Sequence, residues 1–384
     1  MGEFKDFLEQ WCMAMGLPRP SPGEESEVDL AAITLRKLNE FLYQQPAAGQ
    51  AGYISQFQRY WERCHREVIS PSIDRNQCQQ VSLRLAYLFA HPSDHPMYEL
   101  TPPIDRRGLP DEAVANVRFF TVIQDFKIDL HRQGRNPFAQ YRETPEWFDA
   151  EAVAGNPALA DSFLNYLEAR SQVDKRRSWM IEAAQFLADN YAGNAYCLFD
   201  IHGGDAEAIR RALCEPGDIG YSEKKANLFL RDMADWGIWS YRRNYDQVDV
   251  ASDANTMRIA LRTGILRTRM PLLASYLDVY CHQYGLIDEW TRRAWRTVWE
   301  EWQRQDESSA PPTPASMDYV LYGSFGRRLC KPSPSRRKCD ICLFDAICPP
   351  DSRILNPPKS ISIYGATGWE SGKTNAGGGG GIMS

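Results

Sequence analysis

Four of the ten cysteines lie within nineteen residues, as Cys330, Cys339, Cys342 and Cys348, at a spacing of C-x8-C-x2-C-x5-C. Thiolates so close in sequence can surround one small centre, either a tetrahedral Zn²⁺ ion or a [4Fe–4S] cluster. Two disulfides are the alternative, but they are typical of small secreted scaffolds. Zinc sites usually pair one CxxC with a second CxxC or with HxxxH, and neither follows here. The single CxxC followed by x5-C-P therefore favours the cluster, although spacing alone leaves zinc open.

Basic residues accompany these cysteines, although the whole chain carries a formal net charge of −6. Between the first and last of the four cysteines, four lysines and arginines face two aspartates, and two more arginines precede the first. The candidate contacts to a partner are Arg327, Arg328, Arg336, Arg337 and Lys338. A basic loop on an acidic protein indicates that one face of the protein binds an anionic partner. The negative net charge argues against a protein that coats nucleic acid through its overall charge. A solvated run of charges is the alternative.

A second group of reactive side chains precedes the cysteines. Turn residues lead into a predicted helix, Glu223–Met233, which carries Lys224 and Lys225 in its first turn, and Asp253 follows Lys224 by 29 residues. A lysine amine kept neutral by burial can attack an anomeric carbon, and a carboxylate can stabilise the sugar cation that develops. The alternative is a pair of surface lysines at a helix start and an aspartate that serves as an N-cap.

Length and composition are those of a soluble globular protein of two or three domains, with 384 residues, 43% hydrophobic and 24% charged. No apolar run approaches the ~20 residues that span a bilayer. The first residues lack the pattern of a secretory signal. We therefore expect a cytoplasmic monomer without membrane contact, whose six other cysteines are buried thiols.

Hydrophobic periodicity predicts an all-α protein, because helical spacing recurs along the chain and strand signals are nearly absent. The helices that matter most here are expected at Gln77–Phe89, Val114–Leu130, Lys175–Tyr191, Ala254–Thr263 and Glu289–Gln303. Three tryptophans share one face of the last of these, which favours a core stripe over a base-stacking surface. The tail from residue 356 is of low complexity and is predicted to be disordered.

The order of these motifs resembles the helix-hairpin-helix DNA glycosylase superfamily, specifically its endonuclease III-like iron–sulfur branch. The similarity covers roughly residues 114–353. Gly220–Asn227 aligns with the later part of the family hairpin, L-P-G-V-G-x-K-T-A-N, which places Lys224 on the Schiff-base lysine. Asp253–Ala260 matches D-T-H-V-x-R-I-A, which places Asp253 on the family's aspartate. Gly326–Cys330 looks like the G-x-x-x-C that leads into the cluster.

The chain departs from the family pattern in three places. The first loop between cysteines has eight residues where the branch has six, and Ser222 stands where the hairpin has its second glycine. The lysine-to-aspartate interval is longer than in endonuclease III and closer to the archaeal 8-oxoguanine branch. Its extra segment, Trp236–Gln247, is expected to line or reshape a base pocket. Asp249 competes with Asp253 for the carboxylate role, and the Arg-Ile-Ala that follows favours Asp253.

The resemblance implies two helical domains flanking a DNA-binding cleft, with a helix-hairpin-helix motif and a C-terminal [4Fe–4S] cluster loop. We expect an N-terminal helical extension at residues 1–95 that packs on the cluster domain. A helical barrel domain with the hairpin follows at 96–250, the iron–sulfur cluster domain at 251–355 and a disordered tail at 356–384.

The resemblance also implies a DNA glycosylase that binds double-stranded DNA and flips one nucleotide out of the stack. Asp253 would stabilise the sugar cation, and Lys224 would attack the anomeric carbon and then allow β-elimination, as in an AP lyase. A monofunctional enzyme is the alternative. Gly220, Ser222 and Lys225 would grip phosphates, and Gln124 would serve as a wedge or a base-pocket residue.

No motif identifies the substrate base. The adenine-excising E-x-x-L-Q-Q-T and the oxidised-pyrimidine L-S-x-Q-T-x-D are both missing. The N-terminal extension and the longer lysine-to-aspartate interval are additions to the family core. They favour an enlarged pocket for a bulky modified base, such as glucosylated hydroxymethylcytosine of phage DNA, and hence antiphage defence. The alternatives are a repair glycosylase for 8-oxoguanine or oxidised pyrimidines, a non-catalytic iron–sulfur DNA-binding protein, and a zinc protein.

Overall fold

A computed structural model describes Met13 and residues 66–67, 69–100, 106, 108–125, 128, 135–269, 284–331, 334–350 and 352. The chain divides into two compact units. Unit 1 combines Met1–Tyr98, Ser252–Ala310 and Leu321–Ser384, and unit 2 combines Glu99–Ala251 and Pro311–Val320. Unit 2 is therefore inserted into the sequence of unit 1, whose residues come from both sides of the insertion.

The unit boundaries at Tyr98 and Ala251 lie close to residues 95 and 250, where the sequence suggests domain boundaries. Tyr98 and the α4 segment before it belong to the same unit as the cysteine loop. The segment Pro311–Val320 belongs to unit 2, whereas the sequence assigns it to the cluster domain. The predicted tail at 356–384 lies outside the described residues, as does almost all of the predicted extension up to residue 65.

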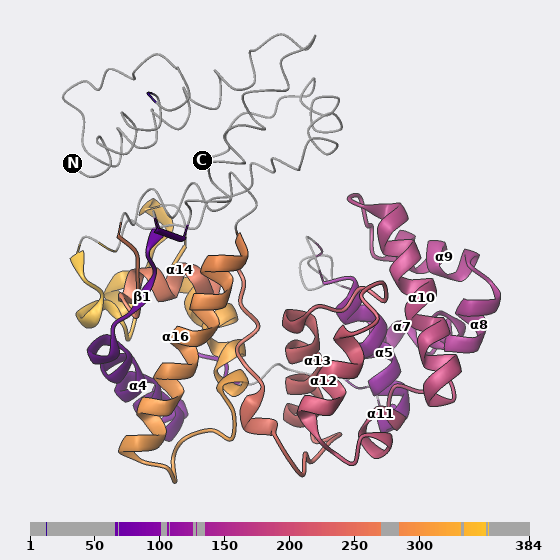
Figure 1. Ribbon diagram of the computed structural model, residues 1–384, viewed down its shortest axis with the longest axis horizontal. Helices are drawn as coiled ribbons and strands as arrows, with labels where there is room; N and C mark the ends of the chain where they lie inside the picture. Colours follow the sequence, from indigo (N-terminus) through magenta and orange to yellow (C-terminus); the bar gives the residue numbers. More distant parts are fainter. Residues whose placement is uncertain are drawn as a thin grey trace. The chain divides into compact units, whose positions relative to one another are not determined.

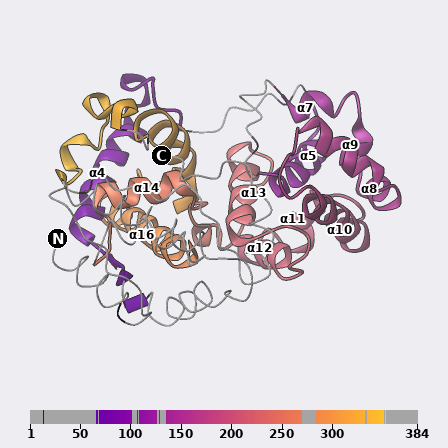
Figure 2. The same cartoon turned by 90° about the horizontal axis from the view of Figure 1, so that it is seen from above.

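Unit 1 is built on three helices, α4 (Arg75–Ala90), α14 (Ala254–Thr263) and α16 (Tyr284–Gln305). Helix α16 packs against both α4 and α14 (Figures 1 and 2). Two short strands, β1 (Ser72–Ile73) and β2 (Leu266–Arg267), pair antiparallel, with Ser72 opposite Arg267 and Ile73 opposite Leu266. This pairing connects the chain before α4 to the chain after α14.

Helix α16 carries the tryptophan stripe of unit 1. Trp295 is fully buried, Trp302 is 1% exposed and Trp299 is 5% exposed. The Trp302 ring meets Phe89 of α4 edge to face, with ring centroids 5.2 Å apart. The interpretation of the stripe as core is therefore confirmed, because large aromatic side chains on one helical face bury the most apolar area against a neighbouring helix.

Unit 2 contains helices packed around an aromatic core that includes Phe119, Phe120, Phe163 and Phe229. Its helices are α5 (Asp111–Ile123), α7 (Pro137–Gln140), α8 (Ala150–Gly155), α9 (Ala158–Tyr166), α10 (Val173–Tyr191), α11 (Cys197–Ile201), α12 (Ala206–Cys214) and α13 (Glu223–Asp235). Helix α10 packs on α5, α8 and α9, and α13 packs on α5 and α12.

Shorter helical turns occupy many connections. The 3₁₀ segments are η1 (Pro92–Asp94), η2 (Pro145–Phe148), η3 (Tyr245–Gln247), η4 (Pro314–Met317), η6 (Pro334–Arg336), η7 (Cys339–Ile341) and η8 (Asp345–Ile347). A π-helix, η5 (Val320–Leu329), leads directly into Cys330. π-Helical turns are rare in proteins, and those that occur are often found at functional sites.

The prediction of a helical protein is confirmed at the level of fold class. Among the described residues, the short strand pair and the π-helix η5 were not predicted. The predicted helix Val114–Leu130 is wrong at its C-terminal end, because α5 stops at Ile123. Gln124 N donates to Thr121 O at 3.1 Å, which tightens the last turn and ends the α-helical ladder. No described helix is both long enough and apolar enough to cross a membrane.

Candidate functional site

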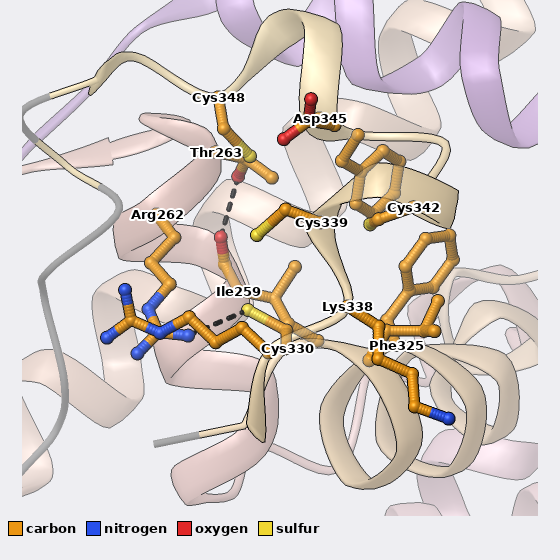
Figure 3. A pocket seen from close by; sticks show the side chains of 13 residues that line it. Ile259, Arg262, Thr263, Phe325, Cys330, Lys338, Cys339, Cys342, Asp345 and Cys348 are labelled. Carbon is orange, nitrogen blue, oxygen red and sulfur yellow. Dashed lines mark hydrogen bonds between the residues drawn. The ribbon is translucent and has the colours of Figure 1, made fainter. Parts of the chain in front are cut away.

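Cys330, Cys339, Cys342 and Cys348 all line one cavity of unit 1, with a volume of about 30 Å³ (Figure 3). Cys330 follows η5, Cys339 opens η7, and the other two flank η8. The rest of the lining comes mainly from α14 and from the ends of the cysteine loop. The structure therefore brings together the four cysteines that the sequence singled out.

The loop between Cys330 and Cys339 is closed at its base by the main chain. Lys338 N donates to Leu329 O at 3.1 Å, and Cys330 N donates to Phe325 O at 2.6 Å in the last π-helical turn. Because these two bonds fix both ends of the loop, the positions of Cys330 and Cys339 do not depend on how many residues lie between them. A loop of eight residues is therefore compatible with both cysteines lining the same cavity.

Two buried arginines of α14 hold the first cysteine. Arg262 and Arg258 are each 3% exposed and lie one helical turn apart. Arg262 Nη1 donates to Cys330 Sγ at 3.2 Å and to Lys331 O at 2.9 Å. Arg258 Nε donates to Cys330 O at 2.6 Å. Neither arginine was predicted as a site residue from the sequence, although two arginines four residues apart in a buried helix are a signal of buried polar partners.

Aromatic rings close the cavity beside Cys342. Phe325 and Phe344 stack with ring centroids 4.1 Å apart, and Tyr98 lies 4.8 Å from Phe325. Tyr98 Oη accepts a hydrogen bond from Leu343 N at 3.0 Å. Burial, with the charges of Cys330 and Cys339, raises the pKa of the Cys342 thiol to about 12. A bound cation would offset that cost, because metal ligation requires the thiolate.

Four cysteines around a shared cavity supply the thiolates that either a [4Fe–4S] cluster or a Zn²⁺ ion would need. Among the residues that the structure describes, no three His, Cys, Asp or Glu side chains converge closely enough to hold one metal ion as they stand. The cluster therefore stays a prediction.

Asp253 is the N-cap of α14 in unit 1. Its Oδ1 accepts hydrogen bonds from Asn255 N at 2.8 Å and Thr256 N at 2.9 Å, and its main-chain N donates to Thr256 Oγ1 at 2.8 Å. This reciprocal capping box is the structural role that the sequence offered as the alternative. The cap also fixes the carboxylate in one orientation, which a group that stabilises a developing cation requires.

Asn255 connects this carboxylate to the buried arginines. Asn255 Nδ2 donates to Asp253 Oδ2 at 2.9 Å, and Asn255 Oδ1 accepts from Arg258 Nη2 at 2.6 Å. Arg258 Nη2 also donates to Gly326 O at 3.1 Å. The candidate carboxylate and the first cysteine are thus positioned by the same helix and share one hydrogen-bonded network.

Replacement of Gly326 by Ala should destabilise unit 1 by about 1–3 kcal/mol, because an added methyl group overpacks the contact. A Cβ at this position would lie 2.5 Å from Asn255 Cβ. Urea unfolding followed by circular dichroism measures the loss. The matched control is Gly155→Ala in α8, where a Cβ would meet nothing within 4 Å. Equal stability of Gly326→Ala and the unmodified protein would contradict the packing described here.

The hairpin residue Gly220 adopts a conformation that requires glycine. Its φ is +77°, and a Cβ would lie 2.8 Å from Trp179 Cγ and 2.9 Å from Ile123 Cγ2. Ser222 has a φ of −124° and is the N-cap of α13, a backbone conformation that serine adopts without strain. The turn therefore leads directly into α13, and its likeness to the family hairpin stays a prediction.

Lys224 and Lys225 differ in their surroundings within unit 2. Lys225 Nζ donates to Ile123 O at 2.7 Å and to Gly220 O at 2.9 Å, and lies 4.5 Å above the Trp179 ring. Burial lowers the pKa of Lys225 to about 8, and nearby cations add to the shift. Lys224 is half-buried and has no hydrogen-bond or ion-pair partner among the described residues. Lys225 is thus held as a clamp between α5 and the hairpin, whereas Lys224 remains available.

Gln124 is 2% exposed and joins α5 to α10. Its Oε1 accepts from Arg176 Nη1 at 3.2 Å, and its Nε2 donates to Arg176 O at 3.4 Å. The same arginine donates to Gln124 O at 2.7 Å. These contacts give Gln124 a structural role in unit 2, and contact with a flipped base stays a prediction.

The segment Trp236–Gln247 packs much of its aromatic surface into unit 2. Trp239 is 2% exposed and meets Phe229 edge to face, with ring centroids 5.4 Å apart. Tyr241 stacks on Tyr245 at 4.7 Å. These residues therefore contribute to the core of unit 2, and their role in a base pocket stays a prediction. Asp249 follows them in a half-buried position.

Four of the five basic residues assigned to DNA binding are exposed, and Arg337 is half-buried. Arg327 Nη1 donates to Tyr322 Oη at 3.3 Å and lies over the Tyr322 ring. Arg328 Nη1 donates to Met97 O at 3.3 Å. Arg337 and Lys338 also line the cysteine cavity. The loop thus presents cations to solvent while its other side surrounds the cavity.

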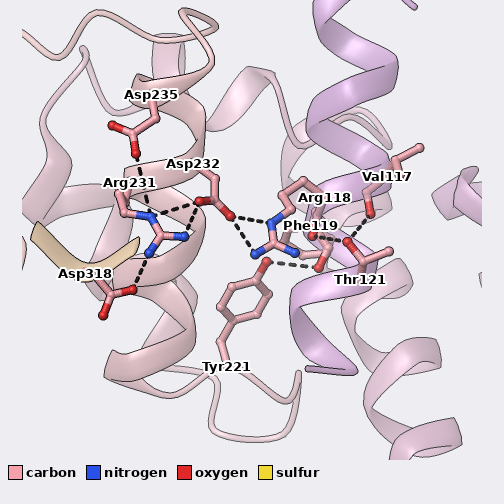
Figure 4. Close-up of polar contacts among 9 residues, drawn as sticks. All are labelled: Val117, Arg118, Phe119, Thr121, Tyr221, Arg231, Asp232, Asp235 and Asp318. Carbon is pink, nitrogen blue, oxygen red and sulfur yellow. Dashed lines mark hydrogen bonds and ion pairs between the residues drawn. The ribbon is translucent and has the colours of Figure 1, made fainter. Parts of the chain in front are cut away.

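A buried charge cluster in unit 2 was not anticipated from the sequence (Figure 4). Arg231, 4% exposed, is paired with Asp232, with Asp235 and with Asp318, and Arg118 Nε donates to Asp232 Oδ2 at 2.6 Å. Asp232 and Asp235 follow Arg231 in the sequence, but Asp318 lies 87 residues away. The cluster joins α5, α13 and the segment after η4.

Asp235→Asn should raise the free energy of unfolding at pH 8 by about 1–3 kcal/mol, since a tenfold change in an acid constant corresponds to about 1.4 kcal/mol. Burial raises the pKa of Asp235 from 3.8 to about 6, with Arg231 opposing and Asp232 adding to the shift. The folded state favours the protonated acid, so this contribution is complete below pH 3.8 and is lost as the pH rises through 6.

Urea unfolding at pH 5 and pH 8 measures this difference. The exposed Asp218, replaced by Asn, is the matched control, because it removes the same charge outside the buried cluster. A stability gain that is equal at both pH values would contradict the assignment to Asp235.

Lys224 belongs to unit 2 and Asp253 to unit 1. Within unit 2 the structure places Gly220 in the turn before α13 and Lys224 and Lys225 in the first turn of that helix, and within unit 1 it brings Asp253 and the cysteines to opposite ends of α14. Comparison with models of known protein families and with curated proteins finds no match to this sequence.

Proposed function

We propose that this protein is a DNA glycosylase that carries a [4Fe–4S] cluster and acts on double-stranded DNA. The observation that supports it most is the joint use of α14, whose first turn orients Asp253 and whose later turns hold Cys330 through Arg258 and Arg262. The turn at Gly220, which requires glycine, is followed by Lys224, which has no hydrogen-bond or ion-pair partner among the described residues. Base excision with strand cleavage needs a carboxylate to stabilise the sugar cation and an amine to attack the sugar. The thiols would hold the cluster.

In the proposed reaction, the nucleotide leaves the stack and the bond between base and sugar breaks. The base departs with the bonding electron pair, and Asp253 stabilises the positive charge that develops on the sugar. The amine of Lys224, once it has lost a proton, bonds to the anomeric carbon and loses a second proton, which yields a Schiff base after ring opening. From there β-elimination cleaves the strand. A glycosylase without this second step uses water in place of Lys224.

The four cysteines would hold the cluster, which when bound would crosslink the loop that carries the basic residues. The exposed Arg327, Arg328, Arg336 and Lys338 would then contact phosphates at fixed positions. Gly220, Ser222 and Lys225 would shape the second phosphate contact at the hairpin. We propose that the protein acts as a monomer.

The test is base release from defined DNA by the full-length protein purified without oxygen. Duplex oligonucleotides each carry one candidate base, including 8-oxoguanine, thymine glycol and uracil, and phage DNA with glucosylated hydroxymethylcytosine is assayed beside them. Abasic sites are scored after alkali. Release from the phage DNA alone would support a bulky modified base and antiphage defence. Release of oxidised bases alone would support repair, and no release from any substrate would contradict a glycosylase.

The second candidate is a non-catalytic DNA-binding protein that keeps the cluster and the hairpin for structure. The capping box of Asp253 favours it, because this aspartate has a complete structural role without any reaction. Tight DNA binding together with no base release would support this candidate. A colourless protein that contains zinc in place of iron would contradict the cluster in either case.

A further inference from the structure

The cavity lined by the four cysteines has an uneven charge around it. Arg262, Arg337 and Lys338 line it, against one carboxylate, Asp345 (Figure 3). Arg262 is 3% exposed, and its Nη1 lies 3.2 Å from Cys330 Sγ. Positive charge in a dry environment acts strongly on a neighbouring centre.

We propose that Arg262 acts through Cys330 to raise the reduction potential of the cluster. The inference depends on the proposed cluster but not on the excision chemistry. A hydrogen bond to a ligand sulfur and a buried positive charge both stabilise the form of the cluster that carries one more electron. The contact with Cys330 Sγ places this charge beside the first of the four cysteines.

The position of Arg262 is fixed from several sides. Its Nη1 also donates to Lys331 O at 2.9 Å, and its carbonyl accepts a hydrogen bond from Ser352 Oγ at 2.6 Å. It follows Arg258 by one turn of α14, and Arg258 donates to the main-chain oxygen of Cys330 at 2.6 Å and also interacts with the Cys330 thiol. Arg262 is the residue with a measured Nη1–Sγ distance, and Arg258 adds a second buried positive charge beside the same cysteine.

The experiment measures the midpoint potential of the full-length, iron-loaded protein by voltammetry, in which the electrode supplies the one electron. Arg262→Gln removes the charge, and we expect the potential to fall by about 59 mV, which corresponds to a tenfold change in the one-electron equilibrium constant. Arg262→Lys keeps a cation without the planar donor and should give a smaller fall. The matched control is Arg336→Gln, which removes an exposed cation of the same loop and should leave the potential nearly unchanged.

Iron content and the visible spectrum are measured on every variant. A potential in Arg262→Gln equal to that of Arg336→Gln, at full iron content, would overturn the inference and leave the proposed function standing. If Arg262→Gln does not retain iron, Arg262→Lys decides, and an unchanged potential there overturns the inference. Absence of iron from the unmodified protein would overturn the proposed cluster itself, whereas base release is scored separately from all of these results.

Discussion

Lys224→Gln is expected to abolish the covalent complex that borohydride forms between the protein and DNA. Borohydride reduces the Schiff base between a lysine amine and the sugar to a stable amine, and glutamine cannot form that bond. Lys224 is the better of two adjacent candidates, because it is half-buried at the start of α13 with no partner among the described residues. Base release by the variant should also fall, by about 10²–10⁴-fold if the amine is the nucleophile.

The informative control is Lys225→Gln. Burial lowers the pKa of Lys225 to about 8, which by itself would make it a plausible nucleophile. Its Nζ nevertheless donates to two main-chain carbonyls, Ile123 O and Gly220 O. We expect this variant to melt at a lower temperature, because two buried carbonyl acceptors lose their donor, and to keep the trapped complex when assayed below its melting temperature.

Gel analysis of borohydride-treated reactions and thermal melts together separate the two lysines. Trapping that persists in Lys224→Gln and disappears in folded Lys225→Gln would transfer the nucleophile to Lys225. Trapping that persists in both variants would assign the covalent step to another amine, and no trapping by the unmodified protein would remove the covalent step from the proposed reaction.

Asp253→Asn is expected to reduce base release by about 10²–10³-fold while the protein stays folded and binds DNA. Asparagine caps helices about as well as aspartate, so Oδ1 would still accept from Asn255 N and Thr256 N. The negative charge that stabilises the sugar cation would be gone. The cost to stability should be about 1 kcal/mol, because Asn255 Nδ2 would face a donor where Asp253 Oδ2 now accepts.

Asp249→Asn is the matched control for this charge. It lies four residues before Asp253, is half-buried, and was the competing candidate from the sequence. Single-turnover excision rates and DNA affinity are measured for both variants. A normal rate in Asp253→Asn would contradict its role, and a large loss confined to Asp249→Asn would transfer the role to that residue.

Local signals in the sequence predicted α14 at its observed bounds, Ala254–Thr263, because an aspartate cap precedes the helix and a glycine follows it. They also predicted α4, α10 and α13 to within a few residues. The end of α5 was missed, because the apolar pattern continues past Ile123 while the main chain turns there. The two-residue strands were missed because their pairing joins residues almost two hundred positions apart.

For the candidate site, the sequence by itself determined which residue types are present and how they are spaced. It predicted the four clustered cysteines, the two lysines at a helix start and the capping aspartate, because each depends on neighbours within a few positions. Only the tertiary structure decided how those residues are held. Arg262 reaches the sulfur of Cys330 across 68 positions, and Lys225 reaches Ile123 across 102. Such contacts follow from the packing of distant helices, and no local pattern contains that information.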